Sequence, residues 1–455
     1  MKKYVISLFI TITVLCGFVL TEVISAYRAE AETQGTLDLG FSVVHITSEL
    51  DPFVQERELW HSGSISIFNH TNGFHLDETP INIRGRGNST WWAGPDKRPL
   101  RFRFPSGDSQ DLLNFGTRHR NWILLANHFD RSLLRNYTAF HLGSLLDGLD
   151  NTPRSFFVHL YVNGLYMGVY QLTDERDIGP GRTEITIHPD PFISEFLIEW
   201  NLRMINEPNK GYDWVMVGSI AFDIRSPSGS VLTRAHADYV YNYLSDVSAS
   251  LIRRDFEAFS GLVCLDSFVD FFLVMEFAKD PDSGFASFFM TIRGQGDTRR
   301  LVLGPIWDFD LAFGNRRAIG TTEFARLGEY GYSPFGLTAT LRNYWFWHAM
   351  AMPEFARLVF DRWQQVSGKE VYATITHVEA VGTFFQDEFE RNFNRHNIMG
   401  IRVWDEPDHI VNTLTHAGQV ELLVDWMKRR RQWMDLHFTE THWPGPPLPV
   451  ELGFN

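Results

Sequence analysis

Two carboxylates stand two residues apart in the run GPIWDFD, residues 304–310. If this run is extended, Asp308 and Asp310 point the same way, because alternate residues of a strand share one face. Two such carboxylates, with coordination positions left for phosphate and water, suit a hard cation such as Mg²⁺. Apolar residues flank both acids, and burying an unpaired carboxylate is costly, so a metal or a basic partner is the favoured interpretation. A structural turn whose aspartate caps a helix is the alternative.

A second acidic pair, Asp280 and Asp282, follows an apolar segment that ends near Phe277. Pro281 lies between the two acids, stops the helix expected here and leaves both carboxylates on a loop. A loop carboxylate beside a metal site could orient or deprotonate an attacking hydroxyl group. A surface turn made of aspartate and proline fits the same residues equally well.

Glycines and basic residues gather around residue 90. Residues 84–90 read RGRGNST, and Lys97 and Arg98 follow. Gly85 and Gly87 let the backbone approach a ligand, and its N–H groups with serine and threonine hydroxyls can hold phosphate oxygens. No G-K-[ST] follows, so this is not a Walker loop. Taken alone, the segment is more simply interpreted as a glycine-containing turn with solvated basic neighbours.

Several other polar segments have two interpretations. Residues 130–136, DRSLLRN, either begin a capped amphipathic helix or brace a cleft through Arg135 and Asn136. Glu175 either ends a strand in solvent or contacts a ligand between two lobes. The basic run 428–431 is expected to lie on a solvated helix face. The motifs H-E-x-x-H and G-x-S-x-G do not occur in the sequence.

The elements that position these residues fall into two groups. Before about residue 230, runs with β-type alternation predict strands, and an Asn163-Gly164 turn predicts the clearest hairpin. After it, and in one segment before it, apolar residues recur at helical spacing. The predicted strands are 41–46, 64–68, 81–84, 100–104, 157–162, 166–172, 196–200 and 220–224. The predicted helices are 131–146, 238–251, 265–277, 354–366, 371–389 and 420–436. A small hairpin, 288–292 with 301–303, leads into Trp307.

This order of elements predicts an α+β fold with two lobes and a cleft between them. A β-rich N-terminal lobe covers 37–230. A mainly helical C-terminal lobe covers 231–442 and carries the acidic residues, and a loose tail covers 443–455.

Length and composition narrow the class of protein further. The 455 residues suffice for one large bilobal unit. A formal net charge of -14 argues against a broad basic face for nucleic acid, so no nucleic-acid partner is expected. Two cysteines in the whole chain exclude a disulfide framework.

The N-terminus indicates export. Lys2 and Lys3 precede an apolar run, residues 4–20, and the small residues Ser25 and Ala26 follow. This pattern predicts a secretory signal peptide or a membrane anchor over residues 1–26, then a polar linker over 27–36. The protein is therefore expected to be exported, either secreted or membrane-anchored.

Four segments, in this order, resemble motifs of the CotH family, which is named from a spore-coat protein. The family motifs are R-G-x-x-S/T with K-K/R-P and a basic strand, W-x-L-L with D-x-S-L-x-R-N, V-N-G-x-Y-x-G-V-Y-x-L-x-E, and W-D-x-D. Their counterparts here are residues 84–101, 122–136, 162–175 and 307–310. The resemblance extends over roughly residues 44–438, most of the chain.

Members of this family resemble protein kinases in fold and transfer phosphate from ATP to protein hydroxyl groups. The resemblance therefore implies a bilobal kinase-like fold, ATP with Mg²⁺ or Mn²⁺ as cofactors, and a protein substrate with serine or threonine acceptors. It implies that Asp308 binds the metal with Asp310 beside it, that Asp282 is the catalytic-loop aspartate, and that Glu175 lies near the hinge. The residues implied to cover or neutralise phosphates are Gly85, Gly87, Asn88, Ser89, Lys97, Arg98 and Arg101.

One departure from the family pattern leaves alternatives open. The family often has N-x-D with an asparagine downstream, whereas this chain has Asp280-Pro281-Asp282 and then Ser287. The asparagine for a second metal is thus replaced, and ATP is scarce outside a bacterial cell. A non-catalytic pseudokinase that serves as a surface or coat-assembly protein is one alternative. A metal-dependent phosphoester hydrolase that uses Asp308 and Asp310 is the other.

Overall fold

The computed structural model describes seven stretches of the chain, which are residues 40–50, 57–68, 75–94, 96–114, 116–207, 212–317 and 332–443. The expected signal peptide or anchor, the linker and all but the first residue of the expected tail lie outside these stretches. None of the helices in the described stretches combines the length and apolar character needed to cross a bilayer.

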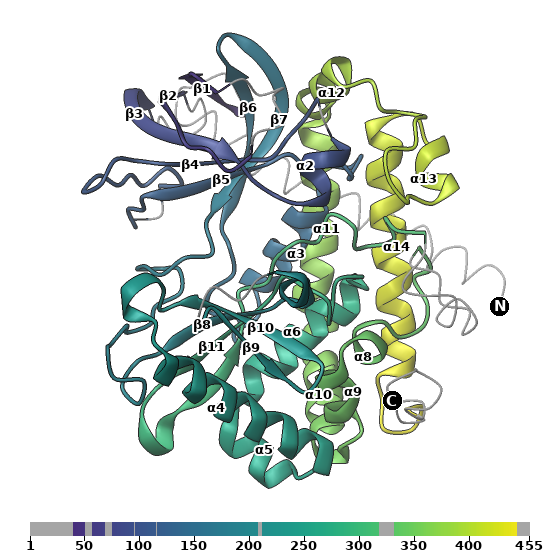
Figure 1. The fold of residues 1–455 in the computed structure, drawn as a ribbon. Coiled ribbons are helices and arrows are strands. Elements are labelled where there is room, and N and C mark those ends of the chain that lie inside the picture. Colours follow the sequence, from purple (N-terminus) through teal and green to yellow (C-terminus); the bar gives the residue numbers. More distant parts are fainter. Residues whose placement is uncertain are drawn as a thin grey trace, which may run out of the picture.

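The N-terminal strands form a closed barrel (Figure 1). Going around it, the strands are β1 (Ser42–Ser48), β2 (His61–Phe68), β3 (His75–Gly85), β4 (Leu100–Arg103), β5 (Asn121–Leu125), β7 (Leu165–Asp174) and β6 (Ser155–Val162). All neighbours are antiparallel except β1 and β6, which pair in parallel and close the barrel. The alternation in β4 shows the pattern that the sequence predicts: Leu100 and Phe102 point into the barrel core, and Arg101 and Arg103 point outward.

The predicted Asn163-Gly164 hairpin is confirmed. These two residues join β6 to β7 with φ values of 52° and 77°, which residues of a tight two-residue turn adopt and which asparagine and glycine tolerate best. The hairpin matters for the cleft because β7 runs from this turn directly to Glu175.

A second sheet of five strands lies below the barrel in Figure 1. Its order is β12 (Arg300–Leu303), β11 (Phe288–Arg293), β8 (Phe196–Trp200), β10 (Ile220–Ser226) and β9 (Trp214–Val217). The sequence places residues 196–226 in the β-rich N-terminal lobe, but here β8 pairs with β11 of the predicted 288–303 hairpin, and β10 and β9 join the same sheet through β8. Because β8 and β11 are far apart in the sequence, no local pattern predicts that they pair.

Helices surround the second sheet and extend alongside the barrel (Figure 1). Near the cleft are α2 (Ser89–Ala93), α3 (Arg135–Ser144), α6 (Leu265–Ala278) and the short η1 (Leu202–Asn206). The others are η2 (Gly229–Val231), α4 (Arg234–Arg253), α5 (Phe256–Leu262), η3 (Gly296–Thr298), α8 (Ala339–Arg342), α9 (Tyr344–Met350), α10 (Pro353–Val366), η4 (Ser367–Val371), α11 (Tyr372–Phe384), α12 (Gln386–Arg395), α13 (Asp408–Asn412) and α14 (His416–His437). The fold is therefore α+β, as the sequence predicts.

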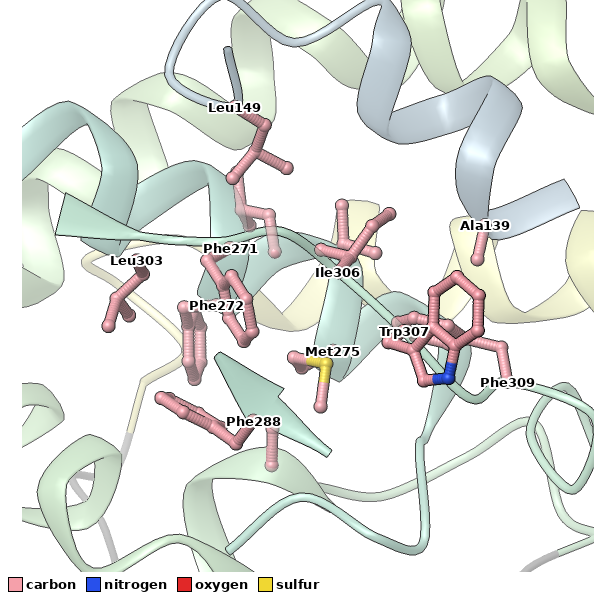
Figure 2. Packing of buried hydrophobic residues seen from close by; sticks show 14 of the residues in the cluster. Ala139, Leu149, Phe271, Phe272, Met275, Phe288, Leu303, Ile306, Trp307 and Phe309 are labelled. Atoms are coloured by element: carbon pink, nitrogen blue, oxygen red, sulfur yellow. The ribbon is translucent and has the colours of Figure 1, made fainter. Parts of the chain in front are cut away.

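Two apolar cores hold this arrangement together. One fills the barrel, and the larger one joins α3, α6, the second sheet and the C-terminal helices. Figure 2 shows the part of the larger core in which Ile306, Trp307 and Phe309 pack near Ala139 of α3 and Met275 of α6. The segment that carries Asp308 is thus fixed by the apolar residues on both sides of it.

Two predictions about helices need correction. The predicted helix 371–389 is two helices, α11 and α12, which meet at Phe385. The basic run 428–431 does not lie wholly in solvent, because Arg430 is fully buried and pairs with the buried Glu276 of α6 at 2.8 Å. A buried arginine needs such a partner to offset its lost hydration.

Candidate active site

A cleft of about 340 Å³ opens between the barrel and the second sheet. Nine residues that the sequence singles out line it, namely Gly85, Gly87, Asn88, Ser89, Arg101, Glu175, Asp282, Asp308 and Asp310. They come from four separate parts of the chain, so the fold brings together what the sequence places far apart.

Lys97 and Arg98 do not line this cleft. Both are buried, with Lys97 Nζ 5.2 Å from the ring centroid of Tyr170 and the Arg98 guanidinium 4.8 Å from that of Trp91. Burial lowers the pKa of Lys97 to about 7. Of the three basic residues implied to neutralise phosphate, only Arg101 therefore stands in the cleft.

The glycine-containing loop turns sharply at the end of β3. A Cβ on Gly85 would lie 2.2 Å from the Trp91 ring, so only glycine lets this buried indole pack against the strand end. Gly87 has a φ of 87°, which favours glycine. Arg57 Nη1 donates to the Gly87 carbonyl oxygen at 2.5 Å and to Asn88 Oδ1 at 2.9 Å. These contacts hold the loop over the cleft.

Arginines crowd around Glu175 on the barrel side of the cleft. Arg101 Nη2 lies 3.1 Å and Arg176 Nη2 3.5 Å from its carboxylate. Burial alone would raise the pKa of Glu175, but the surrounding arginines, with Arg101 foremost, lower it to about 2. Burial and the nearby Arg176 in turn lower the pKa of Arg86 to about 10. This side of the cleft is therefore positively charged and suits phosphate.

The Trp307–Asp310 segment is not extended, contrary to the expectation. Asp308 has a φ of 76°, so the alternation of a strand does not apply, although both acids still line the cleft. Asn136 Oδ1 accepts a 2.7 Å hydrogen bond from the Phe309 N–H. Ser287 Oγ donates to Asp308 Oδ2 at 3.0 Å. Side chains from distant elements thus hold the Asp308 carboxylate and the backbone between the two acids.

The segment 130–136 braces the cleft and also begins helix α3. Asp130 accepts hydrogen bonds from the N–H groups of Ser132 (2.9 Å) and of Arg135 (2.8 Å), the first residue of α3, whereas the N-cap residue Leu134 provides no side-chain cap. Arg135 Nε donates to the Ala312 carbonyl oxygen at 3.1 Å, just beyond Asp310. These contacts favour the bracing interpretation, whereas α3 is not the capped amphipathic helix of the other interpretation, because most of its residues are buried.

Asp282 lies where α6 ends, on the opposite side of the cleft from the glycine-containing loop. The helix stops at Lys279, whose φ is 48°, and the buried Asp280 accepts a hydrogen bond from the Asp282 N–H at 3.2 Å. Burial, and then repulsion from Asp308, raises the pKa of Asp282, although Arg203, Arg316 and Arg342 counteract this effect. A carboxylate with a raised pKa in a cleft is a candidate proton acceptor.

The acidic side of the cleft suits a divalent cation. Burial, and then repulsion from Asp308, raises the pKa of Asp310 well above its ordinary value, and burial with repulsion from Asp282 does the same for Asp280. A cation would relieve this repulsion. Within the described stretches no three acidic, histidine or cysteine side chains are close enough to hold a metal by themselves. The protein would thus supply one or two carboxylates and leave positions for phosphate and water, as Mg²⁺ sites often do.

Sequence reasoning missed several polar residues of the cleft. These are Arg57, Glu58, Arg176, Glu199, Arg203 and Arg225. Arg84, Arg86 and Thr90 of the glycine-containing segment and Ser287, which the sequence did point out, also line the cleft. A signal existed for Glu199, because it is the only charged residue in the otherwise apolar β8 and is buried. It accepts a hydrogen bond from the Ser287 N–H at 3.2 Å. For the arginines no local pattern separates a residue of the cleft from a solvated one.

Comparison with known families gives one finding. The model of a family described as "CotH kinase protein" matches residues 82–434, which is most of the chain. The matched range includes every residue that the sequence singles out for the site. A comparison with curated proteins gave no match.

Proposed function

The chain belongs to the CotH kinase family, and on this premise we propose that it transfers phosphate from ATP to serine or threonine hydroxyls of a protein substrate. One observation carries the proposal. A single cleft holds the Gly85–Thr90 loop with its arginines on one side and Asp282, Asp308 and Asp310 on the other. Phosphoryl transfer needs little covalent chemistry from the protein and depends on positioning and charge, which this arrangement provides.

Different residues of the cleft have different roles in the proposed transfer. The backbone of the glycine-containing loop covers the phosphate chain, and Arg86, Arg101 and Arg176 offset its negative charge. Asp282 accepts the proton of the acceptor hydroxyl as the hydroxyl oxygen attacks the terminal phosphorus. The bond from that phosphorus to the bridging oxygen breaks, and ADP leaves. The raised pKa of Asp282 makes its carboxylate a better proton acceptor near neutral pH.

Asp308 and Asp310 would hold the divalent cation. The cation, Mg²⁺ or Mn²⁺, would neutralise charge on the phosphates when it is bound. Asn136 and Ser287 keep this segment in place, since each makes a hydrogen bond to it. The bilobal kinase-like arrangement belongs to the same proposal: the barrel would be the nucleotide-covering lobe and the second sheet with its helices would be the acceptor lobe.

A second candidate is a non-catalytic member of the family. Ser287 stands near the position where the family often has asparagine, and its hydroxyl group is engaged by Asp308. A site that lacks a second metal ligand would bind nucleotide without transferring phosphate efficiently. The protein would then act as a surface or coat-assembly protein on the same fold.

A transfer assay tests the proposal. The full chain is incubated with γ-³²P-labelled ATP and Mg²⁺ or Mn²⁺, with and without a generic serine- and threonine-rich acceptor, and labelled protein is counted. We expect labelling, and we expect Asp308→Ala to lower it at least about a hundredfold. Asp147→Ala, at a side chain that is 98% exposed, is the matched control and should leave labelling unchanged.

The other outcomes separate the alternatives. Stabilisation by Mg-ATP in a thermal shift assay without any labelled protein would replace the proposal by the non-catalytic candidate. Release of free phosphate without a labelled acceptor would favour a hydrolase.

Export is part of the proposal as well. It rests on the basic residues Lys2 and Lys3 and the apolar run that follows them. Fractionation of cells that express the full chain, with sequencing of the mature N-terminus, tests it. Recovery only in the cytoplasm with an intact N-terminus would contradict it.

A further inference from the structure

Three arginines converge on one indole at the edge of the cleft. The guanidinium carbons of Arg84, Arg101 and Arg103 lie 5.0, 5.5 and 4.0 Å from the ring centroid of Trp60. Strand alternation explains why they meet: Arg84 of β3 pairs with Arg101 of β4, and Arg103 lies two residues further along the same outer face. Trp60 immediately precedes β2, which is the next strand on this side of the barrel.

The positive charge of this cluster is only partly compensated. Arg84 pairs with Glu58, and Arg101 pairs with Glu175. Arg103 and its neighbour Arg120 make no ion pair with any acidic side chain in the described stretches of the chain. Burial first, and then repulsion from Arg120, Arg101 and Arg84, lowers the pKa of Arg103. The chain as a whole has a net charge of -14, but positive charges are concentrated at this cluster. Their mutual repulsion is unfavourable locally.

The geometry favours a phosphate group over a single carboxylate as the ligand. A guanidinium stacked on an aromatic ring keeps its N–H fork in a fixed orientation, which is the form that binds phosphate in bidentate fashion. A phosphoserine carries nearly two negative charges and three acceptor oxygens, enough for several converging guanidiniums. A carboxylate has one charge and two oxygens, so it would leave part of the cluster unpaired.

The position of the cluster connects it with the reaction. Arg84 and Arg101 line the cleft itself, whereas Arg103 does not. Arg103 is two residues from Arg101, about 7 Å along the strand, which is also the spacing of alternate side chains in an extended peptide. An extended substrate with its acceptor hydroxyl in the cleft could therefore place a neighbouring side chain over Trp60.

We propose that Trp60, Arg103 and Arg120, with Arg84 and Arg101, form a docking surface for a segment of the protein substrate that already carries a phosphorylated serine or threonine. This inference rests on the proposed function, because the ligand of the surface is the product of the cleft. A first transfer would create the group that holds the substrate for the next one, so that sites on one substrate are phosphorylated in a defined order.

Equilibrium binding tests the surface without any catalysis. Fluorescence anisotropy is measured on the full chain, in the absence of nucleotide, with three labelled peptides that differ at one position: serine, phosphoserine or glutamate. We expect the phosphoserine peptide to bind at least about tenfold more tightly than the other two. We expect Arg103→Gln and Trp60→Leu each to remove most of this preference. The preference should also decline as salt is added.

The control is Arg118→Gln, which removes the same charge from an exposed arginine of the barrel that does not contact Trp60. It should retain the preference, and melting temperatures should show that all variants are folded. Equal binding of the three peptides, or a preference that survives Arg103→Gln, would overturn the inference. Equally tight binding of the glutamate peptide would overturn the assignment to phosphate. A phosphoserine preference in a protein that transfers no phosphate would refute the proposed function and leave the surface standing.

Discussion

Asp282 is subject to two opposing electrostatic effects. Burial and the nearby Asp308 favour its protonated form, while Arg203, Arg316 and Arg342 favour the carboxylate. Arg316 is the closest of the three in the structure, with Nη1 3.9 Å from Asp282 Oδ1. The balance between these groups determines the pH at which the carboxylate becomes available as a proton acceptor.

This balance predicts a pH dependence of the transfer reaction. If Asp282 is the proton acceptor, as proposed, its carboxylate is the active form, and kcat/KM should fall about tenfold per pH unit once the pH drops below the raised pKa of Asp282. Arg316→Gln removes a charge that lowers this pKa, so the acid limb of the profile should move to higher pH.

The control for this prediction is Arg317→Gln, because Arg317 pairs with Asp405 at 3.2 Å and not with Asp282. A profile that is the same in Arg316→Gln and in the wild type would show that Asp282 is not the group that titrates. The measurement is the initial rate of transfer at low substrate concentration across the pH range.

At the scale of single residues, the sequence predicted the acidic residues of the cleft better than the basic ones. Asp282, Asp308 and Asp310 stand next to proline or apolar residues, where an acid is unusual enough to be noticed. Lys97 and Arg98 look like phosphate ligands in the sequence but are buried away from the cleft, where they lie over the rings of Tyr170 and Trp91. The direction of a side chain depends on partners that the local sequence does not contain.

At the scale of helices, strands and turns, the turn after β3 requires that residue 85 have no side chain. The Gly85→Ala variant would place a methyl group 2.2 Å from the buried Trp91 ring. We expect a loss of about 1–3 kcal/mol in the free energy of unfolding, because a packed core must shift to admit the extra group. The affinity for Mg-ATP should fall too, because Trp91 lies beneath the loop that lines the cleft.

The matched control is Gly261→Ala in α5, where the added methyl group meets nothing within 4 Å. Alanine loses less backbone freedom than glycine in a helix, so this variant should gain about 0.5–1 kcal/mol. Urea unfolding of both variants measures the difference. Equal stability of the two would contradict the packing argument.

Helix α3 fixes the Trp307–Asp310 segment, which is proposed to bind metal, through one amide side chain. Asn136 accepts a hydrogen bond from the Phe309 N–H and donates one to Asn127 Oδ1 at 2.9 Å. Asn136→Ala leaves both buried partners unpaired, so we expect a loss of about 1–3 kcal/mol in stability. Because Phe309 lies between Asp308 and Asp310, transfer activity should fall as well.

The control lies on the same helix. Ser144→Ala alters a solvent-exposed hydroxyl that contacts only the backbone of its own helix, and should change stability by less than about 0.5 kcal/mol. If Asn136→Ala kept full activity at a temperature where it is folded, the bracing role of α3 would be refuted.

The elements themselves followed from the sequence wherever their signal is local. The Asn163-Gly164 hairpin, α6, α10 and the 288–303 hairpin are present as predicted. Strands β8 and β10 were placed in the wrong group of strands, because β8 pairs with β11 across a long stretch of chain. Closure of the barrel by a parallel pairing of β1 with β6 left no signal either, since each strand alone looks like any other half-buried strand.

At the scale of the whole molecule, a buried ion pair connects the segment that follows the barrel strand β5 to the C-terminal part of the chain. Arg131 Nη1 lies 2.8 Å from Glu406 Oε1, and neither side chain reaches solvent. Glu406→Gln leaves a buried guanidinium without a charged partner, so we expect the protein to lose about 3–5 kcal/mol in stability. Urea unfolding measures the effect.

An exposed ion pair gives the comparison. Arg357 and Glu440 are 2.6 Å apart and are 66% and 63% exposed. Glu440→Gln should change stability by less than about 1 kcal/mol, because water screens such a pair. Similar losses in the two variants would mean that the Arg131–Glu406 pair does not contribute through burial.

The parallel pairing of β1 with β6 also has a consequence for the order in which the protein folds. Residues 42–46 must wait for residues 158–162 before the barrel can close. Until then, a chain that is being synthesised from its N-terminus has an unpaired strand at each edge of the incomplete sheet. Contacts between such distant segments form slowly, and open edges are prone to aggregate. A fragment that stops before β6 should therefore associate with copies of itself, whereas one that extends past β7 has the strands to seal its own edges.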